Sequence, residues 1–222
     1  MSESELQLYS LATPNGQKVS VALEEMGLDY DAHLIDISKG DQFTESFVAI
    51  NPNSKIPALV DPVGNHGKPL AIMESGAILM YLAEKTGTFL PQDVALRSKT
   101  LQWLFFQVGG VGPMFGQFGH FFKYAADQCD HPYPTQRYTK EVKRLLGVLN
   151  KQLEDQSFLV GKEITIADFA TAPWVVCLDK FYGGKEILEL SSFTHVQRWV
   201  QAFMDRPAVQ KGMSVCARSI NT

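Results

Sequence analysis

Cysteine, basic charge and long apolar runs are all scarce in this sequence. Only 3 of its 222 residues are cysteine, which excludes a disulfide-stapled small fold and favours a reducing, cytoplasmic location. Lys and Arg number 20 against 24 Asp and Glu, with no basic stripe, so we expect no nucleic acid and no anionic membrane surface as a partner. The N-terminus lacks a signal-peptide pattern, and glycines and a proline interrupt the longest uncharged stretch, residues 103–122.

Several common catalytic and cofactor motifs are also missing. The chain has no dinucleotide or nucleotide phosphate loop, no H-E-x-x-H, no C-x-x-C and no G-x-S-x-G. Its five histidines show no metal-ligand spacing, so we expect no metal. The cysteines Cys129, Cys177 and Cys216 lie far apart in the second half of the chain, which is typical of buried or incidental surface thiols.

What the chain does contain is a core-forming composition, 45% hydrophobic, at a length between one and two domains. Hydrophobic periodicity and turn residues predict the order βαβ, α, ββα over residues 5–86. The expected strands and helices are, in order, 5–10, 19–26, 30–37, 42–50, 57–61, 69–73 and 74–84, with 61–67 as a hairpin loop.

The rest of the chain has a helical period throughout. Apolar faces at 3.6-residue spacing predict helices over 93–107, 134–154, 166–182 and 193–206. Thr165 and Asp168 form a capping box before one of them, with Asp in place of the commoner Glu or Gln. The sequence therefore predicts an α/β domain followed by an all-helical domain.

Small polar residues at turns are the candidate binding groups of the first half. Glu74 and Ser75 stand at the start of a helix, where a carboxylate is favoured and Glu74 can accept from an ammonium, as in the α-carboxylate and α-amino group of an amino acid. Simple N-capping by Ser75 is the alternative. If the Ile56–Pro57 bond is cis, Ile56 can pair with an extended peptide.

A further turn, Thr13-Pro14-Asn15-Gly16, follows the first expected strand. Thr13 can cap the next helix with Pro14 at its first position, and capping alone explains Thr13. Capping does not explain Asn15, which can donate to an anion beyond the helix start.

Taken together, these motifs in this order resemble the cytosolic glutathione transferases over essentially the whole chain. The segments that carry the resemblance are 13–18, 53–58, 74–82, 101–114 and 165–168, and the first four resemble the bacterial Nu class, which is related to the glutathione-binding domain of the yeast prion nitrogen regulator. The resemblance implies a thioredoxin-like glutathione-binding domain over 1–87, a helical domain over 93–222 and a homodimer.

The resemblance also implies roles for individual residues. Glu74 and Ser75 are implied to hold the γ-glutamyl end, and Ile56 the cysteinyl backbone. The remaining implied contacts are Gln42 and Lys55 with the glycine carboxylate, Thr13 and Asn15 with the sulfur, and Gln107 and Arg137 with a second glutathione. A solvated helix face is an equal interpretation of Arg137. Tyr9 is expected to pack.

The Nu class is associated with glutathione-dependent reduction of small disulfides, with weak conjugation and peroxidase activity, at a site that holds two glutathione molecules or the disulfide. This implies a reductase whose thiol comes from glutathione, with Thr13 and Asn15 stabilising the thiolate. Two alternatives are open, namely conjugation to an electrophile and a glutathione-binding regulatory module with little turnover. Eight aromatic residues within 103–124 are expected to serve packing, a hydrophobic pocket over the sulfur, or both.

Overall fold

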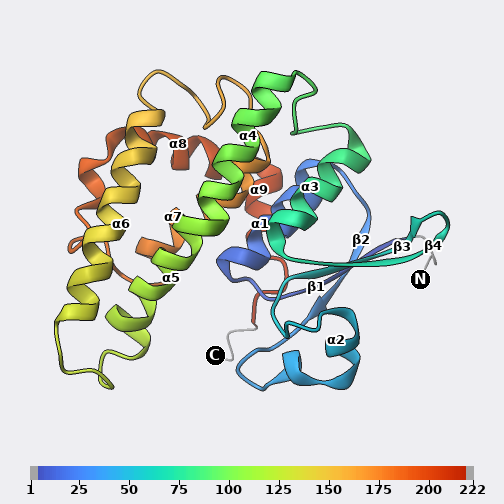
Figure 1. The fold of residues 1–222 in the computed structure, drawn as a ribbon, viewed down its shortest axis with the longest axis horizontal. Coiled ribbons are helices and arrows are strands. Elements are labelled where there is room, and N and C mark those ends of the chain that lie inside the picture. The colour runs from blue at the N-terminus through green and yellow to red at the C-terminus, as the bar shows by residue number, and fades with distance from the viewer. Residues whose placement is uncertain (1–4, 219–222) are drawn as a thin grey trace. The chain divides into compact units, whose positions relative to one another are not determined.

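The computed structural model describes residues 5–218, which form two compact units (Figure 1). Unit 1 combines the chain up to Thr88 with the segment that begins at Arg206, and unit 2 runs from Phe89 to Asp205. The domain boundary expected from the sequence assigned that last segment to the helical half instead.

Unit 1 contains the predicted βαβ, α, ββα order. Its elements are β1 (Leu6–Ser10), α1 (Pro14–Glu25), β2 (Tyr30–Leu34), a 3-10 turn (Asp41–Phe43), α2 (Glu45–Ile50), β3 (Ala58–Asn65), β4 (Lys68–Met73), α3 (Ser75–Thr86) and, near the C-terminus, α9 (Pro207–Gly212).

The four strands form one mixed sheet in the order β2-β1-β3-β4. β1 is parallel to β2, with Leu8 opposite Ala32, and antiparallel to β3, with Leu8 opposite Leu59. β3 and β4 are antiparallel neighbours. The parallel pair needs a crossover connection, which α1 provides, so the predicted βαβ unit is confirmed.

The hairpin loop predicted over 61–67 is wrong, because β3 continues to Asn65 and leaves a short turn at His66 and Gly67. Pro62 was part of the expected loop. It lies beyond Val60, the last residue of β3 that pairs with β1, and within a register shift between Asp61 and Asn65. At such an irregular position a proline removes no ladder hydrogen bond.

Helix α1 is buried over most of its length, from Gly16 to Leu23. Its first turn abuts the chain that leads into it, since a Cβ on Gly16 would stand 2.0 Å from the carbonyl oxygen of Leu11. Only glycine fits at this position, which explains the glycine in the Thr13–Gly16 turn.

The C-terminal segment packs on α1. Ser20 Oγ donates to the carbonyl of Gly212 at 2.7 Å, and Gln17 Nε2 donates to the carbonyl of Met213 at 2.9 Å. The backbone N–H of Ala12 donates to the carbonyl of Cys216 at 3.1 Å. Hydrogen bonds from buried α1 side chains therefore hold this segment in unit 1.

Unit 2 is helical, as predicted. Its α-helices are α4 (Val94–Phe106), α5 (Gly112–Gly119), α6 (Tyr133–Gln152), α7 (Ile166–Lys180) and α8 (Thr194–Met204), with π-helical turns over Gln107–Val111 and His120–Tyr124 and a 3-10 turn over Leu190–Ser192. No helix in the described range 5–218 is long and apolar enough to cross a membrane.

The glycine-rich stretch 103–122 lies within a helical path that runs from α4 through both π-helical turns. Two of its glycines, Gly116 and Gly119, do not end the helical path but leave room for aromatic rings to pack against its backbone. A Cβ on Gly119 would stand 2.2 Å from Cζ of Tyr182, and one on Gly116 would contact the ring of Trp174 at 3.4 Å. The close packing of these rings therefore requires glycine at two of the positions where the sequence suggested an interruption.

The capping box at the start of α7 is confirmed. Thr165 Oγ1 accepts from the N–H of Ala167 at 3.3 Å, and Asp168 Oδ2 accepts from the N–H of Thr165 at 2.9 Å. Asp168 Oδ1 also accepts from the N–H of Leu159 and from Trp199 Nε1, each at 2.9 Å. The fully buried carboxyl therefore joins α7, α8 and the loop before α7.

Candidate functional site

A small hollow in unit 1 brings together residues from three turns that the sequence had singled out. Its volume is about 150 Å³, and its lining residues are Asn15, Asn51, Lys55, Ile56, Pro57, Glu74 and Ser75. Because a typical ligand pocket measures roughly 300 to 1,000 Å³, this hollow can enclose only part of a peptide-sized ligand.

The pair Glu74 and Ser75 forms one end of the hollow. Glu74 precedes α3 with φ 69° and ψ 114°, a conformation that non-glycine residues rarely adopt. Its side chain makes no capping hydrogen bond and is exposed, whereas Ser75 is 8% exposed. The exposed carboxylate of Glu74 can therefore accept from a ligand, and simple capping does not account for it.

The opposite wall is the loop before β3. The Ile56–Pro57 peptide bond is cis, and Ala58 begins the strand. Asn51, which is 2% exposed, supports this loop, since its Nδ2 donates to the carbonyl of Lys55 at 2.6 Å and its Oδ1 accepts from the N–H of Asn53 at 2.9 Å. Asn51 thus sets the position of Ile56 beside the hollow.

The first turn of α1 supplies Thr13 and Asn15. Thr13 is the N-cap residue, and its Oγ1 accepts from the N–H of Gly16 at 3.4 Å. Because an N–H can only donate, the hydroxyl proton of Thr13 lies away from this contact. Asn15 lines the hollow. Tyr9 stacks on His33 with ring centroids 4.6 Å apart, so it packs as expected.

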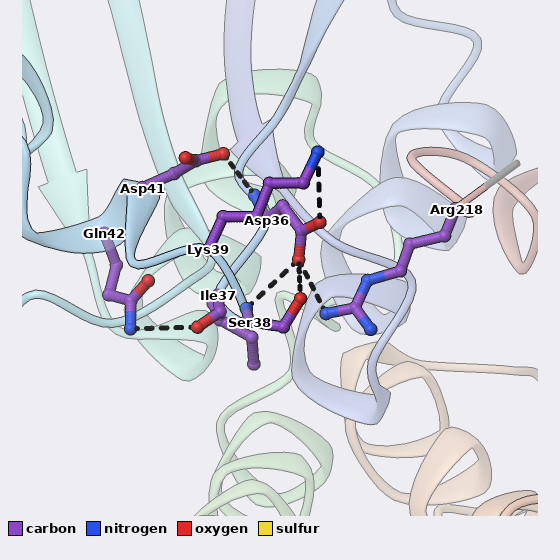
Figure 2. A network of polar contacts seen from close by, with 7 residues as sticks. All are labelled: Asp36, Ile37, Ser38, Lys39, Asp41, Gln42 and Arg218. Atoms are coloured by element: carbon purple, nitrogen blue, oxygen red, sulfur yellow. Dashed lines mark hydrogen bonds and ion pairs between the residues drawn. The ribbon is translucent and has the colours of Figure 1, made fainter.

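Gln42 lies outside this lining, on the 3-10 turn after β2. Its Nε2 donates to the carbonyl of Ile37 at 3.4 Å, and its Oε1 is buried with no hydrogen-bond partner among the described residues (Figure 2). The structure therefore places Gln42 on the same unit as the hollow but with its amide turned into its own loop.

The loop that carries Gln42 is held by Asp36 (Figure 2). Asp36 Oδ1 accepts from the hydroxyl of Ser38 and from the guanidinium of Arg218, both at 2.7 Å, and the N–H of Asp36 donates to Asp41 at 2.8 Å. The Ser38 hydroxyl, assisted by the charge of Arg218, lowers the pKa of the Asp36 carboxyl. The C-terminal segment and the loop that carries Gln42 are thus linked.

Sequence reasoning missed a buried lysine behind the hollow. Lys18 of α1 is 2% exposed, and its Nζ donates to Ser75 Oγ at 3.2 Å. Burial lowers the pKa of Lys18 to about 7, while the Glu74 carboxylate acts in the opposite direction. The burial of Lys18 could have been predicted from its place in the helix. Lys18 precedes the buried Val21 and Ala22 by three and four residues, so it lies on the same helix face as they do.

The two remaining candidates, Gln107 and Arg137, belong to unit 2. Gln107 begins a π-helical turn and has no exposed surface, and its Nε2 lies 2.8 Å from where a Cβ on Gly112 would stand. Arg137 is exposed on α6 and borders a surface hollow of about 380 Å³ together with Tyr133 and Arg144.

The three cysteines are free, and two have a raised pKa. Cys177 is 1% exposed, and burial raises the pKa of its thiol to about 12. Burial also raises the pKa of Cys216, which lies in unit 1 rather than in the helical half as expected. A raised pKa keeps both as protonated, weakly nucleophilic thiols near neutral pH. No cluster of candidate metal ligands occurs within residues 5–218.

The four-stranded βαβαββα arrangement of unit 1 defines a thioredoxin-like domain, and unit 2 adds a helical domain. Residues 12–85 match the family described as glutathione S-transferase, N-terminal domain, and residues 101–207 match glutathione S-transferase, C-terminal domain. The chain belongs to the glutathione S-transferase family.

Relatives of this chain include both a named enzyme and solved structures. The disulfide-bond oxidoreductase YghU of Escherichia coli K12 is 51% identical over 218 residues, covering 95% of this chain and 74% of YghU. A family member from Pseudomonas fluorescens pf-5, solved with two glutathione molecules, is 48% identical with a TM-score of 0.95, covering 97% of this chain and 95% of its own. A Pseudomonas putida transferase, solved with one glutathione disulfide per subunit, is 47% identical with a TM-score of 0.92, covering 99% of this chain and 93% of its own.

Proposed function

We propose that this protein is a Nu-class glutathione-dependent disulfide-bond reductase. The observation that carries the proposal is the hollow, whose groups complement the γ-glutamyl end and the cysteinyl backbone of glutathione. Glu74 offers a carboxylate to an ammonium, Ser75 and the N-terminus of α3 offer donors to a carboxylate, and Ile56 offers backbone groups to the cysteinyl residue. Its volume of about 150 Å³ suits this part of the tripeptide.

The glycine carboxylate of glutathione requires further donors outside this core. Lys55 lines the hollow and carries a positive charge, and Gln42 lies on the neighbouring loop. The Nε2 group of Gln42 has two protons, of which one is directed at the carbonyl of Ile37, so the second can donate to a ligand. The hydrogen bond to Ile37 is long at 3.4 Å and therefore weak, so it opposes a change of the amide's direction only slightly.

Thr13 and Asn15 are proposed to stabilise the glutathione thiolate. The hydroxyl proton of Thr13 is available because its oxygen accepts from Gly16, and the 12-residue helix α1 directs its positive dipole end toward the same place. Donors and a positive dipole end favour the thiolate and lower the pKa of the thiol. This arrangement activates sulfur without a protein cysteine.

The proposed reaction is a balanced pair of thiol–disulfide exchanges. The first thiolate attacks one sulfur of the substrate disulfide, the substrate S–S bond breaks as a mixed disulfide forms, and the departing thiolate takes a proton. A second glutathione thiolate attacks the mixed disulfide and releases the second substrate thiol. Two glutathione molecules are oxidised to one glutathione disulfide while one substrate disulfide is reduced. The two glutathiones and the glutathione disulfide in the Pseudomonas relatives support this stoichiometry.

The proposal extends to assembly, location and a second ligand. Three free cysteines support a reducing cytoplasm. The exposed side chains of Phe105 and Val94 on α4, at 62% and 82%, support a homodimer, which light scattering can test.

Arg137 is proposed to bind a carboxylate of the second glutathione, with Gln107 shaping that site from within unit 2.

The direct test measures binding and turnover on the full chain. Calorimetry should show glutathione binding, and oxidation of NADPH through added glutathione reductase should report reduction of 2-hydroxyethyl disulfide. Ser75→Ala should weaken binding, whereas Ser157→Ala, at an exposed serine of unit 2, is the matched control. Turnover of 1-chloro-2,4-dinitrobenzene alone favours conjugation, and binding without either activity favours the regulatory module.

A further inference from the structure

Lys18 occupies an unusual environment for a lysine. It is 2% exposed, and lysine is among the side chains least often buried completely. Its Nζ lies 3.2 Å from Ser75 Oγ, so a side chain of α1 reaches the first residue of α3 from behind the hollow. The lysine therefore contacts the serine that is proposed to meet the ligand.

Among the acidic groups around α1, Glu74 is the carboxylate whose charge affects the pKa of Lys18. Burial lowers the pKa of Lys18 to about 7, and the Glu74 charge counteracts part of that effect. Three other acidic groups on or beside these helices have cationic partners of their own. Lys211 of α9 lies 2.8 Å from Glu24, Arg206 lies 2.6 Å from Glu25, and Lys85 of α3 lies 2.8 Å from the buried Asp61 of β3.

The contact determines the direction of the Ser75 hydroxyl. An ammonium can only donate, so Ser75 Oγ accepts from a protonated Lys18. The single hydroxyl proton of the serine then points away from the lysine, and it can donate to a ligand beside the N–H groups of the first turn of α3. A neutral amine can accept instead, and the serine proton can then turn toward Lys18.

We propose that Lys18 is a positioning residue that fixes the Ser75 hydroxyl as a donor and so makes the hollow select a ligand carboxylate, that of the γ-glutamyl end. The proposal rests on the proposed function. A carboxylate bound at Ser75 adds a negative charge near Lys18 and favours its protonated form. Binding near neutral pH therefore takes up a proton.

The test uses S-methylglutathione, whose sulfur does not titrate, and the full-length protein. Calorimetry in buffers of different ionisation enthalpy gives the number of protons taken up on binding. We expect an uptake of about half a proton at about pH 7 that increases toward one at about pH 8, because the free protein loses the Lys18 proton over this range. Lys18→Met should remove the part of this uptake that Lys18 contributes, whereas any part due to the ligand's own titrating groups is the same for both proteins.

A second measurement tests selectivity for the carboxylate. The wild type should prefer S-methylglutathione over its analogue with an amide in place of the γ-glutamyl carboxylate by about 10-fold or more, the range of a hydrogen bond to a charged group. Lys18→Met should reduce this preference, and it should have a smaller effect on affinity in a Ser75→Ala background than in the wild type.

Three results overturn the inference and leave the proposed function standing. Binding by the wild type without proton uptake contradicts it even if no variant folds. A Lys18→Met protein that keeps the wild-type uptake and preference also contradicts it, as does an undiminished Lys18→Met effect in the Ser75→Ala background. A wild-type protein that does not bind S-methylglutathione at all refutes the proposed function as well, which separates the two failures.

Discussion

Replacing Asp168 with alanine should destabilise the protein strongly. The buried carboxyl accepts hydrogen bonds from the N–H groups of Leu159 and Thr165 and from the indole of Trp199, each at 2.9 Å, and from the hydroxyl of Thr165 at 3.0 Å. Alanine leaves these donors without their acceptor in a region that water does not reach, because Asp168 is 0% exposed. The hydroxyl can rotate to another acceptor, but the three N–H donors cannot.

The magnitude follows from those three donors. A buried donor left unsatisfied costs about 1 to 3 kcal/mol, so the expected loss for three donors is roughly 3 to 9 kcal/mol, comparable to the whole stability of many domains. Urea unfolding followed by far-ultraviolet circular dichroism measures it as a lower midpoint. Asp168→Asn should lose less, because its amide oxygen can still accept from Leu159 and Trp199.

The matched control is Asp155→Ala, which removes an exposed carboxylate from unit 2 and should change the free energy of unfolding by less than about 0.5 kcal/mol. A loss below about 1 kcal/mol for Asp168→Ala would refute the reasoning, because it would mean that the three donors find other partners or water.

Further predictions concern pH, catalysis and packing. Because the pKa of Lys18 is about 7 in the fold against 10.5 in the unfolded chain, the unfolded chain binds more protons between these values, and stability should increase by about 2 kcal/mol from pH 7 to pH 9. Urea midpoints should show this rise in the wild type and not in Lys18→Met. Asn15→Ala should lower kcat by about 10-fold with little change in glutathione affinity, and Ser75→Ala should show the reverse pattern in steady-state kinetics and calorimetry. Gly119→Ala should lower the melting temperature, measured by calorimetry, because its methyl group would overlap the ring of Tyr182, at a cost of about 1 to 3 kcal/mol.

Local patterns predicted several regular elements of both units well. The period of two predicted β1 and β2, although β2 ends at Leu34 rather than at residue 37. The Thr165–Asp168 spacing predicted its capping box, because the sequence carries every group that the motif needs. The end of β3 could not be predicted from local pattern. A proline disrupts a strand only where its missing N–H would bond to a neighbouring strand, and β1 pairs with β3 only as far as Val60, before Pro62.

Long-range packing accounts for what the sequence could not predict. Gly116 and Gly119 read as breaks because the rings that need their small size come from residues about 60 positions away. The assignment of Cys216 to unit 1 depends on contacts with α1 and the preceding turn. Lys18 lay within a motif that the sequence had marked, but its role depends on Ser75, 57 residues later.

The most direct test of the central claim, that glutathione supplies the reactive thiol, removes every cysteine from the chain. A Cys129→Ala, Cys177→Ala and Cys216→Ala protein should reduce 2-hydroxyethyl disulfide with glutathione at a rate within about twofold of the wild type, since a twofold change is under 0.5 kcal/mol in activation free energy. Loss of this activity in a folded variant of unchanged oligomeric state would contradict the account. The single Cys216→Ala variant would then test the cysteine whose backbone carbonyl accepts from the N–H of Ala12, the residue before Thr13.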